Sequence, residues 1–182
     1  ATWLACAAIT GGSLRLLQTD AASLEGILDV FEQMNCRCSR SAESICFSAG
    51  TPLRAVRYLK TMPYPGFPTD AQAILTAVLC KASGTSVLEE TIFENRYRHV
   101  DALVRMGADI QVAGRVAVVH GVGHLHGAAV SATDLRGGAA LLTAGLGAEG
   151  ETILTEISHI DRGYDAPETV LRSVGAQIKR VD

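Results

Sequence analysis

The sequence predicts an α/β fold made of three copies of one unit in which helices and strands alternate. Two long blocks, residues 69–93 and 133–158, share one order of features: Thr-Asp, an apolar helical stretch, a glycine and a short alternating strand. Residues 1–18 match the second half of that block. Repetition on this scale indicates a fold assembled from copies of one supersecondary unit.

The first helix of each copy is apolar. In copy two it follows "YPGFP", residues 64–68, whose prolines and glycine oppose a helix, and it starts with Thr69 and Asp70. Thr133 and Asp134 have that place in copy three, whereas copy one begins inside its helix. The glycines expected between this helix and the strand are Gly12, Gly84 and Gly150.

A second helix is expected after each strand. The apolar positions that follow the helical period are Leu24, Ile27, Leu28 and Phe31 in copy one, and Val100, Leu103 and Val104 in copy two. In copy three Asp165, Pro167 and Glu168 resemble a capping box at a helix start. The residues that suit the left-handed position after these helices are Asn35, Gly107 and Gly175.

A hairpin closes the unit. Residues 108–121 turn at Ala113–Gly114, and residues 36–50 are their counterpart in copy one. Copy three ends in "IKRVD", a first hairpin strand that would leave an unpaired edge. We therefore predict one domain, residues 1–182, with repeats at approximately 1–62, 63–127 and 128–182, and expect residues before Ala1 or another polypeptide to complete it.

Composition narrows the class of protein. An apolar fraction of 48% supports a packed core, and a net charge of −3 with mixed signs argues against nucleic-acid binding. No stretch reaches the roughly 18 apolar residues of a membrane helix, and no basic segment suggests a signal peptide. Five irregularly spaced cysteines fit a reducing cytoplasm better than a disulfide framework, so we expect a cytoplasmic protein.

Several motifs resemble nucleotide-binding or metal-binding sites, but their spacing does not support such sites. The glycines of residues 115–127, "RVAVVHGVGHLHG", are spaced GxGxxxG rather than GxGxxG, and no helical pattern follows. The three histidines of this stretch lack a clear fourth metal ligand, so a solvated loop is the better interpretation. Cys36 and Cys38 fit two strand residues better than a zinc site. We expect no metal and no cofactor.

The Thr-Asp pairs have two interpretations. Asp70 and Asp134 could cap their helices. Alternatively, the positive end of the helix dipole favours an ionised carboxylate that faces a ligand and accepts a proton or a hydroxyl hydrogen bond. Arg136, in the first turn after Asp134, stands against the preference of the dipole and thus hints at an anionic ligand.

Two loops at matching points of copies two and three contain arginines that could bind a ligand. Arg162 lies in "SHIDRGYDAP", where it could bind an anion or form a surface ion pair with Asp161. Arg96 lies beside Phe93 in "ETIFENRYRHV". Arginine with an aromatic ring suits a planar, anionic ligand, although a structural loop anchor fits equally well.

Taken together, residues 64–73, 84–110, 132–154 and 159–181 resemble the family of UDP-N-acetylglucosamine 1-carboxyvinyltransferases, enolpyruvyl transferases of peptidoglycan synthesis. The resemblance runs nearly end to end and is weakest over residues 1–62. It implies an inside-out α/β barrel lobe built from three βαβαββ repeats and incomplete at both ends. The family has two such lobes, and its N-terminal strands return to complete the lobe that this chain resembles.

The resemblance also implies a reaction. The enolpyruvyl group of phosphoenolpyruvate passes to the 3′-hydroxyl of UDP-N-acetylglucosamine, and Asp70 would contact that hydroxyl and take its proton. Ile92, through its backbone, and Phe93 would meet the nucleotide-sugar. Arg136 and Arg162 would hold the phosphate and carboxylate of phosphoenolpyruvate. The further site candidates are Asp134 and Arg96.

Two family features do not occur in the chain: a Lys-Asn pair, and a mobile Gly-Gly-Cys loop whose cysteine is a general acid. We therefore expect the chain to supply one wall of a cleft, to need the second lobe as partner and to be inactive alone, with no nucleic-acid or membrane partner. The alternative is a non-catalytic, stand-alone domain that binds a nucleotide-sugar or a partner protein. The loops "TIFENR" and "HIDRGY" favour the amino-sugar enzyme over the related shikimate-pathway transferase.

Overall fold

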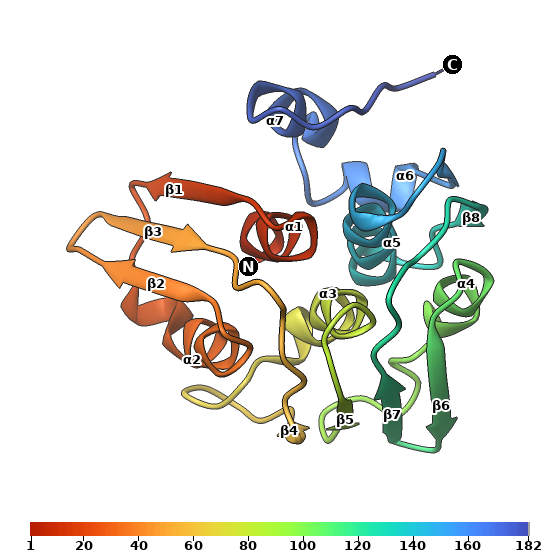
Figure 1. Ribbon diagram of the computed structural model, residues 1–182, viewed down its shortest axis with the longest axis horizontal. Coiled ribbons are helices and arrows are strands. Elements are labelled where there is room, and N and C mark those ends of the chain that lie inside the picture. The colour runs from red at the N-terminus through yellow and green to blue at the C-terminus, as the bar shows by residue number, and fades with distance from the viewer. Residues whose placement is uncertain (182) are drawn as a thin grey trace.

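A computed structural model describes residues 1–181 and shows helices inside and sheets outside (Figure 1). The central helices are α1 (Thr2–Thr10), α3 (Thr69–Leu79) and α5 (Leu135–Gly147), one from each copy, and they pack against one another. This arrangement confirms the predicted inside-out α/β lobe.

The central helices are buried because they are apolar on every side. All residues of α3 from Ala71 to Leu79 are buried, and so are residues 4–9 of α1. Helices of this kind belong in a core rather than at a surface. Small residues allow close packing: a Cβ on Gly147 of α5 would lie 2.6 Å from Ile9 Cγ1 of α1. None of the helices in residues 1–181 has the length and hydropathy of a membrane span.

The first sheet has the order β1-β3-β2 and is antiparallel throughout. Its strands are β1 (Ser13–Leu17), β2 (Arg37–Arg40) and β3 (Ser44–Ser48). A short 3-10 turn, Ala22–Leu24, leads into α2 (Glu25–Gln33), and Asn35 follows it with a left-handed φ of 75°. The predicted helix and hairpin of copy one are therefore confirmed.

The second sheet has the order β4-β5-β7-β6. Its elements are β4 (Tyr58–Lys60), β5 (Thr85–Glu89), α4 (Val100–Arg105), β6 (Asp109–Ala113) and β7 (Val116–His120). With α3 they form a complete βαβαββ unit, in which β4 and β5 are parallel and the other pairs antiparallel. The predicted boundary between the first and second repeats, after residue 62, stays a prediction. β4, the first strand of the second unit, lies before that boundary. The hairpin turns at Gly114–Arg115, one residue later than predicted, because Gly114 takes the positive φ of 60°.

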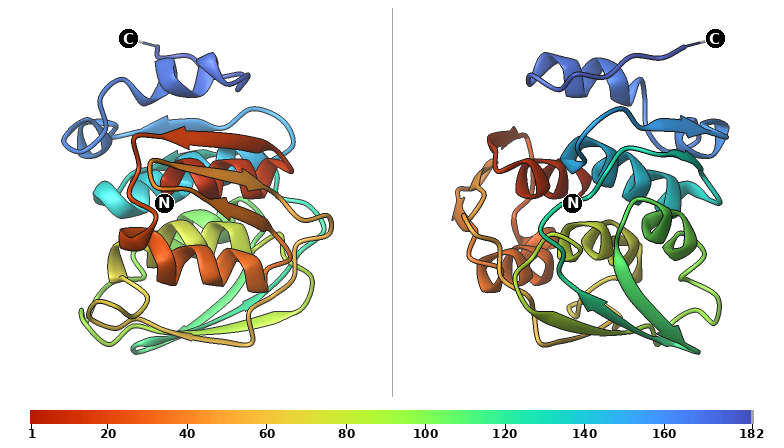
Figure 2. Two further views of the ribbon diagram at one scale, coloured as in Figure 1. Left: turned by 90° about the vertical axis from the view of Figure 1, so that its left-hand side faces the viewer. Right: turned by 45° about the vertical axis from the view of Figure 1, so that its right-hand side comes forward.

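The third copy contains β8 (Ala129–Ser131) and β9 (Ile153–Thr155), a parallel pair, followed by α6 (Ser158–Asp161) and α7 (Pro167–Ser173). Figure 2 shows α7 and the last described residues at one end of the molecule. Two predictions are wrong here. The capping box does not form, because Ala166 precedes α7 and no side chain caps it. Residues 178–181 form no strand, since no neighbouring strand in the described part pairs with them; Asp182 lies outside the described residues.

Candidate active site

Asp70 is held between two arginines at the start of α3. Its Oδ1 lies 2.8 Å from Arg96 Nη2, and its Oδ2 lies 2.7 Å from Arg136 Nη2. The side chain of Asp70 is 56% exposed, while those of Arg96 and Arg136 are 20% and 30% exposed. The cluster therefore lies at the surface, with its charged groups accessible to a ligand.

The carboxylate of Asp70 can face the two arginines because it does not cap its own helix. The N-cap of α3 is Pro68, which has extended backbone angles and no side-chain oxygen. The segment before it turns back on itself, with Gly66 N–H donating to the Pro63 carbonyl and Met62 N–H to the Phe67 carbonyl. The capping interpretation of Asp70 is therefore wrong.

Asp134, at the matching point of copy three, does cap its helix. Its Oδ1 accepts hydrogen bonds from the backbone N–H groups of Arg136 and Gly137, each at 2.9 Å. Partial burial opposes ionisation of this carboxyl, but the two N–H groups outweigh it and lower the pKa of Asp134. Oδ1 of Asp134 thus caps α5 and binds the backbone N–H of Arg136 in its first turn.

Arg96 connects Asp70 to the loop after β5. Its guanidinium carbon lies 4.9 Å from the centre of the Phe93 ring, a cation–π contact. Ile92 and Phe93 beside it are 40% and 49% exposed. Charged, aromatic and aliphatic groups are therefore exposed together around Asp70, as a ligand with both anionic and apolar parts would require.

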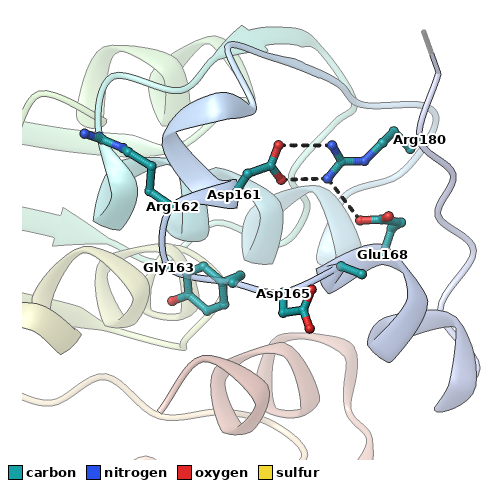
Figure 3. A pocket seen from close by; sticks show the side chains of 8 residues that line it. Asp161, Arg162, Gly163, Asp165, Glu168 and Arg180 are labelled. Atoms are coloured by element: carbon teal, nitrogen blue, oxygen red, sulfur yellow. Dashed lines mark hydrogen bonds and ion pairs between the residues drawn. The ribbon is translucent and has the colours of Figure 1, made fainter.

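Arg162 is not part of this cluster. Its Nη2 lies 3.0 Å from His159 Nδ1, and within residues 1–181 it makes no hydrogen bond or ion pair with Asp70 or Arg136. Asp161, the partner that the sequence suggested, instead binds Arg180 through contacts of 2.7 and 3.0 Å. Figure 3 shows Arg162 extending away from that pair. The ion-pair alternative for Arg162 is wrong, and its role in anion binding stays a prediction.

Comparison with known proteins identifies the family. Residues 1–171 match the model of the family "EPSP synthase (3-phosphoshikimate 1-carboxyvinyltransferase)". This chain belongs to the EPSP synthase family. Two solved structures share the fold: an enolpyruvyl transferase, NikO, from Streptomyces tendae, with a TM-score of 0.88 and 28% identity over 98% of this chain and 42% of that one, and an EPSP synthase from Acinetobacter baumannii, with a TM-score of 0.72 and 22% identity over 99% and 42%.

Two relatives named as UDP-N-acetylglucosamine 1-carboxyvinyltransferases are also similar to this chain. A UDP-N-acetylglucosamine 1-carboxyvinyltransferase from Zymomonas mobilis subsp. mobilis is 51% identical over 180 residues, 99% of this chain and 42% of the relative. A UDP-N-acetylglucosamine 1-carboxyvinyltransferase 2 from Caldanaerobacter subterraneus subsp. tengcongensis is 47% identical over 99% of this chain and 43% of the relative. The resemblance stated from the sequence is confirmed. The chain spans about two fifths of the length of these relatives.

Glu90 of this chain lies close to the candidate site but was not among the predicted site residues. It is 1% exposed and directly follows β5. Its Oε1 accepts hydrogen bonds from the backbone N–H groups of Ile92 at 2.8 Å and Phe93 at 3.1 Å. The two-residue period of buried positions could have indicated Glu90, because Ser86, Leu88 and Glu90 all face inward.

His120 is the last residue of β7, and His124 and His126 follow that strand. His120 Nδ1 lies 2.9 Å from Thr85 Oγ1, and His124 pairs with Glu149. Within residues 1–181 no group of His, Cys, Asp and Glu side chains is arranged to hold a metal ion. The loop interpretation is therefore wrong for His120, which lies in a paired strand, and it fits His124.

Proposed function

We propose that this chain forms one wall of the active-site cleft of an enolpyruvyl transferase. The enzyme would pass the enolpyruvyl group of phosphoenolpyruvate to the 3′-hydroxyl of UDP-N-acetylglucosamine, a step of peptidoglycan synthesis in the cytoplasm. The observation that carries the proposal is Asp70, held between Arg96 and Arg136 at the start of a helix. The names of the curated relatives support the choice of acceptor.

The geometry suits a proton acceptor beside an anion site. Asp70 would accept the proton of the 3′-hydroxyl as that oxygen bonds to C2 of phosphoenolpyruvate, while C3 gains a proton from an acid outside this chain. Loss of a C3 proton and cleavage of the C2–O bond to phosphate then give the enol ether and inorganic phosphate. Misplacement of the acceptor by even about 1 Å would be costly, which explains the rigid approach to Asp70.

The arginines would hold the anionic groups. Asp70 binds only Nη2 of the Arg136 guanidinium and Tyr164 lies beside it, so guanidinium N–H groups remain for phosphate or carboxylate. Arg162 would supply the second guanidinium. Because the Ile92 N–H is bonded to Glu90, the backbone carbonyl of Ile92 is the group left to meet the nucleotide-sugar. Asp134 would act through Arg136, whose N–H it binds.

The test is a chimera in which this chain replaces the matching segment of the Zymomonas mobilis relative. Phosphate release from phosphoenolpyruvate is measured with UDP-N-acetylglucosamine and, separately, with shikimate 3-phosphate as acceptor. We expect turnover with the amino-sugar acceptor, a loss of at least about a hundredfold in Asp70→Asn, and no change in Asp101→Asn. Asp101 is an exposed carboxylate in the first turn of α4 and is the matched control.

Other outcomes contradict the proposal. A chimera that binds UDP-N-acetylglucosamine without turnover would favour the non-catalytic binding domain. Preference for shikimate 3-phosphate would favour the related transferase. Turnover by the 182-residue chain alone would contradict the view that it supplies only one wall.

A further inference from the structure

We propose that Glu90 is a positioning residue that places Asp70 and the Ile92–Phe93 loop together. The inference rests on the proposed function, because it assigns Glu90 to the acceptor side of that same site. Glu90 would not touch substrate. It would act through the residues that do.

The contacts of Glu90 join three segments of the chain. Oε1 accepts from the hydroxyl of Thr61 at 2.9 Å as well as from the Ile92 and Phe93 N–H groups, and Oε2 accepts from the hydroxyl of Thr69 at 2.8 Å. A buried carboxylate is tolerated when its lone pairs are bonded in this way. A single side chain therefore links the end of β4, the start of α3 and the loop after β5.

The Thr69 contact accounts for the orientation of Asp70. With its hydroxyl bonded to Glu90, Thr69 becomes the first residue of α3, and Asp70 stands second in the helix, facing its arginines. In copy three the Thr133 hydroxyl bonds to Asp134 itself, the helix begins one residue after the aspartate, and the aspartate caps it. The same Thr-Asp pair thus has opposite roles, and the Glu90 bond marks the difference.

The chain contains its own comparison residue. Glu156 stands six positions after Gly150, as Glu90 stands six positions after Gly84. Glu156 is exposed, has a left-handed φ of 55°, and its side chain makes no hydrogen bond within the described residues. Substitution of Glu156 therefore changes the same residue type at the same point of the repeat without touching the proposed network.

The kinetic test uses the chimera with Glu90→Ala and Glu90→Gln, and with Glu156→Ala and Glu156→Gln as matched controls. In Glu90→Ala we expect KM for UDP-N-acetylglucosamine to rise about tenfold or more, kcat to fall about tenfold, and KM for phosphoenolpyruvate to stay within about threefold. Glu90→Gln keeps an oxygen for the loop N–H groups and should hold KM for the nucleotide-sugar within about threefold. The Glu156 variants should match the parent.

A merely structural role gives a different result. Loss of folded protein lowers kcat but leaves both KM values unchanged, and that outcome overturns the proposal. If Glu90→Ala does not fold, Glu90→Asp carries the same test, since a side chain shorter by one methylene cannot reach Thr69 and both loop N–H groups at once.

A second measurement separates this inference from the proposed function. In the 182-residue chain, hydrogen exchange of the Ile92 and Phe93 amides should be at least about tenfold faster in Glu90→Ala and unchanged in Glu156→Ala. An inactive parent chimera would defeat the proposed function, yet this exchange would still decide the role of Glu90. Unchanged exchange at both amides overturns the positioning role even if the chimera is active.

Discussion

Asp70 and Arg136 form an ion pair, 2.7 Å between Oδ2 and Nη2, although 66 residues separate them in the sequence. Each stands in the first turn of a central helix, α3 or α5. Because these helices pack side by side, their N-terminal turns can bring a carboxylate and a guanidinium group together at one surface. The packing of the repeats therefore creates the candidate site, which no single copy contains.

The first prediction concerns Arg136. In Arg136→Lys, one ammonium cannot hold both Asp70 and a substrate anion, because lysine lacks the planar fork of N–H donors. We expect KM for phosphoenolpyruvate in the chimera to rise about 10- to 100-fold, with a change below about 1 kcal/mol in the free energy of unfolding. Steady-state kinetics and urea unfolding measure both, and Arg172→Lys, at an exposed position of α7, is the control. An unchanged KM would remove Arg136 from the anion site.

The second prediction separates the two Thr-Asp copies. Asp134→Ala removes an N-cap and should lower the free energy of unfolding by about 1–2 kcal/mol, whereas Asp134→Ser should recover most of it. Asp70→Ala, at the same point of the repeat, removes only exposed ion pairs and should cost less than about 1 kcal/mol. Urea unfolding of the full chain compares the three variants. Equal losses for the two alanine variants would contradict the assignment of different roles.

Local patterns were sufficient to predict most of the helices and strands, whereas the inside-out arrangement was implied by the family resemblance. The helical and two-residue periods located the central helices and hairpins because side-chain burial follows each element's own geometry. The relation of Asp70 to Arg96 and Arg136 could not be predicted, since it depends on three segments meeting in space. The predicted terminal strand failed for a related reason: a strand needs hydrogen-bonding partners, and within residues 1–181 no strand pairs with residues 178–181.

Glu90 shows a different limit of sequence analysis. Its inward position followed from the alternation of β5, yet a glutamate at a strand end is normally taken to be exposed. Its burial is explained by the donors that surround it, and the two hydroxyl donors, Thr61 and Thr69, come from distant positions in the sequence.

The third prediction tests why glycines follow β7. A Cβ on Gly121 would lie 1.6 Å from the Ala82 carbonyl oxygen, whereas a Cβ on Gly123 would meet nothing within 4 Å. We therefore expect Gly121→Ala to lower the free energy of unfolding by more than about 2 kcal/mol and Gly123→Ala to change it by less than about 1 kcal/mol. Thermal and urea unfolding make the comparison. Similar stabilities would mean that close packing does not explain Gly121.

The fourth prediction concerns His99, which is 1% exposed and whose Nε2 has no hydrogen-bond partner in the described structure. Burial lowers its pKa from the usual 6.5 to about 4; the charge of Arg96 acts in the same direction, whereas Asp134 and a hydrogen bond with the Arg96 backbone oppose it. Between these pH values the unfolded chain binds a proton that the folded chain does not. The free energy of unfolding should therefore fall as the pH decreases from 6.5 to about 4, by about 3 kcal/mol.

Urea unfolding at a series of pH values measures this slope. His99→Gln should remove about 3 kcal/mol of the pH dependence over that range whatever its effect at neutral pH, because only the titrating group contributes to the slope. Ionisable groups remote from His99 contribute alike to the parent and to His99→Gln, so the difference between the two curves reports the titration of His99 and its coupling to Asp134. Parallel curves for the parent and His99→Gln would mean that the folded protein binds a proton at His99 as readily as the unfolded chain does.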